Sequence, residues 1–222
     1  EIFKNIDSYI NYVYKLIVVD NSPIVNINTE QKLSQKYDNI IYVANGKNLG
    51  IATALNIACD KAIELKQEWI LTMDQDSYFQ NYKSYLECFH TVLKQERNIA
   101  IITPNHTHIQ NDIVPNCSYE PKQIVITSGN MLNLQHFNKI GRYNDELFID
   151  MVDYDLSLKV ELHSLKTFML TNHYIIHNIG EIFKRKNILT GKIKEKIEKI
   201  VSNNKKIELN GDFSFLKYEL TK

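Results

Sequence analysis

The stretch "WILTMDQDSYF" (69–79) decides the fold, because an apolar run leads directly into two acids. Residues 69–73 are those of a buried strand, and Asp74 and Asp76 follow one residue apart. In an extended segment, residues i and i+2 point to the same side, so the pattern predicts that both carboxylates share one site. The structural alternative is that Asp76 and Ser77 cap the helix that follows. The stretch therefore indicates either an acidic binding site or a helix cap at the end of a strand.

Three further apolar runs are rich in β-branched residues: "LIVVDNS" (16–22), "IIYVA" (40–44) and "AIITP" (100–104). Apolar residues at helical spacing lie between the runs, over 50–66 and 82–93. Strands that alternate with helices at this pitch predict an α/β fold with a mainly parallel sheet. Ligands of such sheets bind at the carboxyl ends of the strands. The polar positions expected there are Asp20, Asn48, Gly50, Asp74 and Asp76.

The second half of the chain has a less regular pattern. Residues 122–134 are expected to be extended and to pass through Ser128 and Gly129, and a helix is expected from about Val152, with Asp153 in its first turn. From 182 to 206 there are nine Lys or Arg and two Glu, with apolar residues at helical spacing. We therefore expect one α/β domain over 1–181 and a basic amphipathic tail over 182–222.

Composition excludes several classes of protein. Basic and acidic residues number 26 each, so no net field attracts DNA or RNA, and nucleic acid is not an expected partner. The three cysteines (59, 88 and 117) are far apart in sequence, which argues against a zinc or redox pair and suits a reducing cytosol. No apolar run approaches the roughly 20 residues that cross a bilayer, and the start lacks the order of a signal peptide. We expect a cytoplasmic protein, either free or peripheral to the inner face of the plasma membrane.

Five motifs in order resemble a known family. They are "DNS" after a strand, "NLGIATALNIA", "DQDS" after a strand, "SGNMLNLQHFNKIGRYNDELFIDMVDYDLSLKV" and "HNIGE". The order and spacing resemble the family 2 inverting glycosyltransferases of GT-A fold, and most of all their rhamnosyltransferase-like branch, over about 3–181. The resemblance implies a GT-A-like, mainly parallel sheet flanked by helices. It also implies transfer of a sugar, rhamnose by branch, from a nucleoside-diphosphate sugar to a glycan or lipid-linked acceptor in bacterial surface polysaccharide synthesis.

The resemblance also implies roles for single residues. A divalent cation, Mn²⁺ or Mg²⁺, bound by carboxylates can neutralise a leaving diphosphate. Inversion needs a carboxylate that takes the acceptor's proton on the face opposite the leaving group. By this resemblance Asp20 contacts the base of the nucleotide, Asn48 and Gly50 belong to the loop before the second helix, and Asp74 contacts the ribose or the metal shell. Asp76 and His177 bind the metal, and Ser128 and Gly129 lie under the donor sugar. Asp153 is the catalytic base, with Asp150 and Asp155 as alternatives.

Each role has a structural alternative. Asp20 is also placed to form an Asx turn, Gly50 to be a turn glycine with Asn48 as its cap, Asp153 to cap a helix and His177 to be a polar strand end. His106 and His108 are read as loop residues without function, and Lys159 stands where relatives more often have Arg.

The chain departs from the family pattern at its start. Relatives open with a strand that ends in a "TYN"-like turn, whereas this sequence opens with an expected helix over 3–15. The expectation is a domain without its first strand and with one wall of the nucleotide pocket missing.

Two other functions fit parts of the sequence. A haloacid-dehalogenase-like phosphatase also has D-x-D after an apolar strand, but usually on the first strand of its domain. A non-catalytic nucleotide-sugar binding module would fit the missing strand. The tail also has two interpretations: its apolar stripe packs on the domain, which we favour, or 182–206 lies on an anionic membrane.

Overall fold

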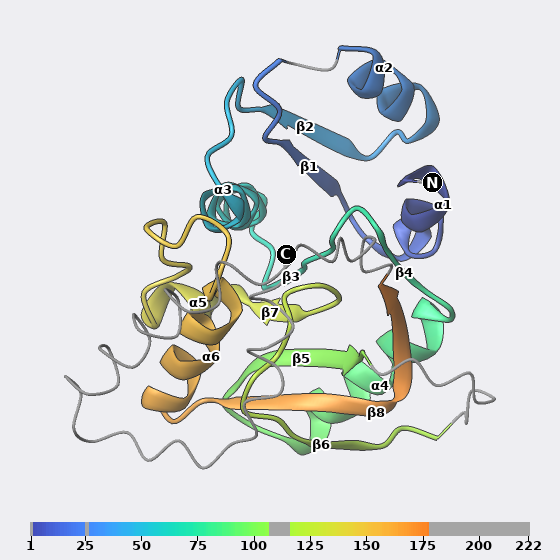
Figure 1. The fold of residues 1–222 in the computed structure, drawn as a ribbon. Helices are drawn as coiled ribbons and strands as arrows, with labels where there is room; N and C mark the ends of the chain where they lie inside the picture. The colour runs from blue at the N-terminus through green and yellow to red at the C-terminus, as the bar shows by residue number, and fades with distance from the viewer. Residues whose placement is uncertain (1, 25–26, 107–115, 178–222) are drawn as a thin grey trace, which may run out of the picture. The chain divides into compact units, whose positions relative to one another are not determined.

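The structure is a computed structural model that describes residues 2–24, 27–106 and 116–177 (Figure 1). These residues belong to one compact unit, Glu1–Asn178. No helix within these ranges is both long and apolar enough to cross a membrane. The predicted tail, with its packing or membrane role, lies outside the described residues, so the predicted division at 181 stays a prediction.

Helices and strands alternate over the first half of the chain. The helices are α1 (Ile2–Asp7), α2 (Ile27–Lys36), α3 (Ile51–Glu64), α4 (Tyr82–Gln95), α5 (Leu134–Lys139) and α6 (Val152–Leu162). The strands are β1 (Leu16–Asp20), β2 (Ile40–Ala44), β3 (Trp69–Leu71), β4 (Ser77–Phe79), β5 (Ile99–Asn105), β6 (Tyr119–Pro121), β7 (Met131–Asn133) and β8 (Lys166–His177). A short 3₁₀ helix, Ile10–Tyr12, lies between α1 and β1.

The helix expected over 3–15 is shorter in the structure. After α1 ends at Asp7, the backbone continues with bonds between residues three apart, from Ser8 N to Asn5 O and from Tyr9 N to Ile6 O, both at 3.1 Å. Such bonds tighten a helix into a 3₁₀ turn. The Ser8 hydroxyl also donates to Asn5 O at 2.7 Å, and this competing side-chain bond favours the end of the α-helix.

The strands form two sheets of mixed orientation. β1 and β2 pair in parallel, and a second sheet has the order β3-β7-β5-β8-β4, with β6 also paired to β8. Within the second sheet β5 and β8 are parallel, whereas the other described pairs are antiparallel. The predicted α/β class is confirmed, but the sheet is mixed where the helix-strand alternation predicted a mainly parallel one. The difference arises because β4, β6 and β7 run against their neighbours.

Buried side chains cover both faces of the larger sheet. Ile101 and Ile102 are neighbours on β5 and therefore point to opposite faces. Both are 0% exposed, and each belongs to a different apolar cluster. The cluster around Ile102 includes residues of α4, and the cluster around Ile101 includes residues of α3, α5 and α6. Apolar side chains therefore pack against both faces of the sheet at β5.

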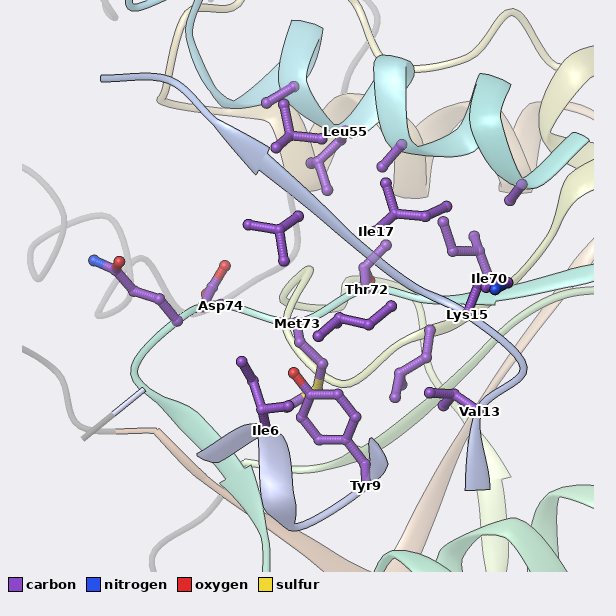
Figure 2. A pocket seen from close by; sticks show the side chains of 18 of the residues that line it. Ile6, Tyr9, Val13, Lys15, Ile17, Leu55, Ile70, Thr72, Met73 and Asp74 are labelled. Atoms are coloured by element: carbon purple, nitrogen blue, oxygen red, sulfur yellow. The ribbon is translucent and has the colours of Figure 1, made fainter. Parts of the chain in front are cut away.

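A cavity of about 1050 Å³ lies between β1 and β3 (Figure 2). Leu55 of α3 lies on one side of it, and Ile6 and Tyr9 lie on the other. The two strands run in the same direction, from Lys15 to Ile17 and from Ile70 to Asp74 (Figure 2). Among the described strands β1 pairs only with β2 and β3 only with β7, so each has one edge that no described strand occupies.

Two of the cysteines are closer than the sequence predicted. Cys88 of α4 and Cys117 form a disulfide across 29 residues, with their Cα atoms 5.0 Å apart. The expectation from their spacing that no two cysteines pair is therefore wrong, because the fold brings the segment before β6 against α4. A disulfide is rare in a reducing compartment, so this pair argues against the cytosolic interpretation of the cysteine spacing. Cys59 is a free, buried thiol on α3.

Candidate active site

The D-Q-D segment is a turn. β3 ends at Leu71, and Ser77 N donates to Asp74 O at 3.2 Å, which closes a four-residue turn. The prediction that Asp74 and Asp76 share a side because the segment is extended is therefore wrong in its geometry. The alternative that Asp76 and Ser77 cap the next helix is also wrong, because Asn81 is the N-cap of α4 and accepts from Ser84 N.

Residues 127–130 hold the strand that leads into this turn. The Thr72 hydroxyl donates to Thr127 O at 2.6 Å, and Gly129 N donates to Thr72 O at 2.7 Å. Asp74 N donates to the Ser128 hydroxyl at 3.2 Å. The structure therefore brings Ser128 and Gly129 directly beside the segment from Thr72 to Asp74.

Asp153 lies against the same loop. It is half-buried in the first turn of α6, and its Oδ1 accepts a hydrogen bond from the Thr127 hydroxyl. Burial raises the pKa of the Asp153 carboxyl; the hydrogen bonds from Thr127 lower this pKa, the Asp74 charge raises it again, and the net shift is upward. A carboxylate with a raised pKa is a better proton acceptor than an ordinary aspartate.

The two rival acids have other surroundings. Asp150 is exposed, and Asp155 forms an ion pair with Lys159, its Oδ2 lying 2.7 Å from the Lys159 Nζ. The Lys159 Nζ also donates to Arg142 O at 2.9 Å, so this lysine has a structural partner on the loop before α6. The N-cap position of α6 is Met151, not Asp153. Of the three acids, Asp153 is the one whose carboxylate the structure ties to the 127–130 loop.

Asp20 lies at the end of β1 and lines the cavity. Its carboxylate accepts from Ser22 N at 2.8 Å, which is the predicted Asx turn, and from the Tyr42 hydroxyl at 2.6 Å. Desolvation first, and then the bond to Asp20, raises the pKa of Tyr42 well above its usual value. The Asx turn and a nucleotide-binding role are compatible, because the turn places the carboxylate at the cavity.

Asn48 and Gly50 form the loop before α3. Gly50 N donates to Asn48 Oδ1 at 3.0 Å, and Asn21 Nδ2 donates to Gly50 O at 2.9 Å. Asn48, Gly50, Asp20 and Asp74 all line the cavity. The end of β1, the loop before α3 and the end of β3 are therefore brought together.

Gly50 also touches the segment that leads to α6. A Cβ on Gly50 would lie 2.5 Å from Phe148 O and 2.7 Å from its ring atom Cδ2. Ile51 N donates to Phe148 O at 2.7 Å. The backbone of Gly50 has φ 82° and ψ 166°, a region that side chains rarely adopt. A glycine is therefore needed at this point for both conformation and space.

Replacing Gly50 with Ala should destabilise the domain more than the same change at Gly46. Gly46 also has positive φ, 64°, but a Cβ there meets nothing within 4 Å. The control change should cost about 1–2 kcal/mol for the left-handed backbone. Gly50→Ala should cost about 1–3 kcal/mol for the strained backbone, and it should cost more because Phe148 must also move. Urea denaturation measures both; equal losses would show that the approach of Phe148 does not matter.

The residues at the turn suit a hard cation. Asp74 and Asp76 supply carboxylate oxygens, and the Ser77 hydroxyl is buried without a hydrogen-bond partner among the described residues. Within the same part of the chain no three His, Cys, Asp or Glu side chains cluster as a metal site. Mg²⁺ is typically held by one or two carboxylates, with substrate phosphates and water as further ligands. The donor set therefore fits a cation that binds together with a diphosphate.

His177 is described only by its backbone. It ends β8, where it is paired with Ser77 of β4. The His177 backbone is therefore paired with the residue that follows Asp76. Its role as a metal ligand stays a prediction.

Comparison with known proteins identifies the family. The family model "Glycosyl transferase family 2" matches residues 2–112. This chain belongs to glycosyl transferase family 2. The family 2 chain is 26% identical over 187 residues to the dTDP-rhamnosyl transferase RfbF of Shigella flexneri, which covers 75% of this chain. It spans 60% of the length of that relative. The predicted family is confirmed, and the predicted resemblance to rhamnosyltransferases agrees with this relative.

Solved structures confirm the GT-A-like fold of the family 2 chain. GalNAc-T7, in a structure with UDP, GalNAc and Mn²⁺, has a TM-score of 0.63 at 11% identity, over 79% of this chain and 40% of that one. S. aureus TarS has a TM-score of 0.59 at 14% identity, over 94% and 38% of the two chains. TarS 1–349 in complex with UDP has a TM-score of 0.53 at 17% identity, over 78% and 56%.

Sequence reasoning missed several side chains that hold the site of this family 2 domain. Thr127 precedes Ser128 and Asn21 follows Asp20, so adjacency to a predicted residue could have found both. Tyr42 and His106 carry no such signal. His106 was read as a loop residue without function, yet its Nε2 lies 2.8 Å from Ser128 O.

Proposed function

We propose that this family 2 domain is the catalytic part of an inverting hexosyltransferase. It transfers a sugar, rhamnose by analogy with the dTDP-rhamnosyl relative, from a nucleoside-diphosphate donor to a hydroxyl of a glycan or lipid-linked acceptor in bacterial surface polysaccharide synthesis. The observation that carries the proposal is that Thr127 binds Asp153 while its neighbour Ser128 binds the backbone of Asp74. One loop therefore supports both a candidate base and the acidic turn.

In the proposed reaction Asp153 takes the proton of the acceptor hydroxyl as that oxygen attacks the anomeric carbon. A carbon–oxygen bond to the acceptor forms, and the bond from the anomeric carbon to the diphosphate oxygen breaks. The diphosphate leaves with the electron pair. Because attack comes from the face opposite the leaving group, the configuration inverts.

The donor would lie at the end of the cavity that is lined by the polar strand ends, beside Asp20 and Asp74. The fitted cation, Mn²⁺ or Mg²⁺, would neutralise the charge that develops on the leaving diphosphate. The presence of UDP and Mn²⁺ in the GalNAc-T7 structure supports these ligands as candidates. The proposed donor residues are Asp20, Asn48, Gly50, Asp74, Ser128 and Gly129, and the proposed metal ligands are Asp76 and His177.

The cavity between β1 and β3 supports the prediction of an absent first strand. Both flanking strands run in the same direction, and helical segments lie on both sides of the space (Figure 2). A strand of about the length of β1, which has five residues, would pair with both free edges and join the two sheets. We propose that the family's first strand lies here, and that it completes the nucleotide pocket beside Asp20.

This proposal predicts that an apolar five-residue strand joined ahead of Ile2 raises stability. It buries apolar surface in the cavity and supplies backbone partners to both edges. The measurement is the melting temperature of the extended chain, with a scrambled polar extension as control. Equal melting temperatures for the two extensions would contradict the placement.

The open cavity also favours a second candidate, a non-catalytic nucleotide-sugar binding module. The family match leaves the phosphatase alternative without support. Thermal shift with dTDP or UDP, with and without Mn²⁺, followed by a transfer assay, tests all three. We expect metal-dependent stabilisation by diphosphates and acceptor-dependent release of the nucleotide. Binding without transfer to any acceptor would support the module, and turnover of p-nitrophenyl phosphate without nucleotide binding would support the phosphatase.

A further inference from the structure

Two buried asparagines far from each other in sequence each hold one half of the candidate site. Asn5 of α1 is 3% exposed and Asn56 of α3 is 8% exposed. Each uses its side-chain amide to bind a loop: Asn5 binds the acidic turn, and Asn56 binds the segment that leads to α6 and Asp153. A buried amide is costly unless it is hydrogen-bonded, so such groups are informative when their partners are known.

Asn5 holds the acidic turn. Its Nδ2 donates to Gln75 O at 2.8 Å, across 70 residues, and Gln75 is the residue between the two acids. Three residues further along, the Ser8 hydroxyl accepts from Phe79 N at 3.1 Å. Asn5 and Ser8 therefore form hydrogen bonds to the backbone both before and after Asp76.

Asn56 holds the loop before α6. Its Nδ2 donates to Tyr143 O at 3.0 Å and to Asp145 Oδ1 at 2.8 Å, and its Oδ1 accepts from Tyr143 N at 3.3 Å. The amide thus pairs with the backbone of Tyr143 in both directions, as a neighbouring strand would. The backbone carbonyl of Asn56 also accepts from Arg142 Nη2 at 3.1 Å.

Tyr143, which Asn56 binds, lies close to the proposed catalytic base, Asp153. It is 3% exposed, and its phenol lies near enough to Thr127, the residue that binds Asp153, for Thr127 to lower the Tyr143 pKa. Burial raises the pKa of Tyr143 far above its usual value, and the charges of Asp153 and Asp74 add to the shift, so the three groups lie within electrostatic reach. Tyr143 also belongs to the same buried cluster as Val125 and Val152, so displacing its backbone would disturb the packing beside Thr127 and Asp153.

We infer that Asn5 and Asn56 are positioning residues with separate duties: Asn5 orients the acidic turn toward a cation and diphosphate, and Asn56 orients the Thr127–Asp153 pair toward the acceptor. This inference rests on the proposed transferase function. Neither asparagine touches the substrate in it. Each acts through the loop that its amide binds.

The test compares Asn5→Ala with Asn56→Ala, each serving as the control for the other, because both remove a buried amide. Two quantities are measured: the Mn²⁺ concentration that half-saturates dTDP or UDP binding, and kcat at saturating donor and metal. Loss of a hydrogen bond is typically worth about 2- to 13-fold in an equilibrium. We expect Asn5→Ala to raise the Mn²⁺ midpoint by roughly 3- to 10-fold, with a smaller effect on kcat. We expect Asn56→Ala to lower kcat by a similar factor, with a smaller effect on the midpoint.

A general loss of structure would change both quantities alike in both variants, and that result would overturn the inference. If Asn56→Ala fails to fold, Asn56→Asp keeps the acceptor for Tyr143 N while it removes the two donated bonds. An Asn56→Asp variant that lowers metal affinity as much as kcat would also overturn it. Failure of the proposed function itself is recognised separately, because the unsubstituted chain would then show neither metal-dependent nucleotide binding nor transfer.

Discussion

Replacing Asp153 with Asn should lower the rate of sugar transfer by about 10²- to 10⁴-fold, the usual effect of losing a general base. The amide keeps the shape of the carboxylate but cannot take the acceptor's proton. Binding of a nucleoside diphosphate with Mn²⁺ should stay close to that of the unsubstituted chain, because the proposed role of Asp153 is on the acceptor side. The measurements are kcat at saturating substrates and calorimetric binding of dTDP or UDP.

Asp155→Asn is the matched control, since it changes the same kind of residue on the same helix. Asp155 pairs with Lys159 at 2.7 Å, and its loss should mainly cost stability, by about 0.2–1 kcal/mol. A loss of turnover in Asp155→Asn as large as that in Asp153→Asn would indicate a structural effect of α6. Full activity in Asp153→Asn would move the role to Asp150 or Asp155.

The same variant has a pH signature. Burial, with the Asp74 charge adding to it, raises the pKa of Asp153 above the value of about 3.9 for an ordinary Asp. As the pH falls, Asp153 therefore becomes protonated, and inactive as a base, at a higher pH than an ordinary aspartate would. In a plot of kcat against pH, the fall in activity on the acidic side should lie at a correspondingly higher pH. In Asp153→Asn the residual activity should lack this fall.

Stability should change in the opposite sense. A folded-state pKa above the unfolded one means that the folded chain binds more protons between the two values, so stability falls as pH rises through that window. Asn, which never ionises, avoids this penalty. Asp153→Asn should therefore unfold at higher urea concentration than the unsubstituted chain at pH 7, and the advantage should shrink at a pH below both pKa values.

Sequence patterns predicted the helices and strands whose bounds depend on residues close together in the sequence. β2 lies at 40–44 as predicted, because "IIYVA" is a compact apolar run between polar residues. α4 begins at Tyr82 as predicted, because helical spacing and the cap at Asn81 agree. The orientation of β7 against β3 and β5 had no local signal, since pairing depends on which distant strand lies beside it.

The site was predicted in part for the same reason. The family motifs predicted Asp74 and Asp153 as site residues, and both form hydrogen bonds with the 127–130 loop in the structure. The D-Q-D segment was expected to be extended, but a bond between Ser77 N and Asp74 O makes it a turn. The bond from Asn5 to Gln75 spans 70 residues, and such contacts leave no periodicity to read.

Replacing Asp76 with Asn should weaken metal-dependent donor binding by more than about 100-fold. Loss of a residue that only supports a metal ligand typically costs about 10- to 100-fold, and Asp76 is proposed as a direct ligand. The change removes one negative charge while it keeps the size of the side chain, so the turn closed by Ser77 N and Asp74 O should persist. A second reason to expect the fold to survive is that the N-cap of α4 is Asn81, whose side chain accepts from Ser84 N. The measurement is the affinity for dTDP and UDP over a range of Mn²⁺ concentrations, with melting temperature recorded for each sample.

Asp38→Asn is the control for the loss of one charge, because Asp38 is exposed just before β2 and is not among the cavity-lining residues. We expect Asp38→Asn to bind nucleotide with the same Mn²⁺ dependence as the unsubstituted chain. Asp76→Asn should bind nucleotide about equally with and without Mn²⁺, because the carboxylate that draws the cation to the diphosphate is gone. Unchanged metal dependence in Asp76→Asn would show that the acidic turn does not hold the cation, and that the two acids after β3 serve another purpose.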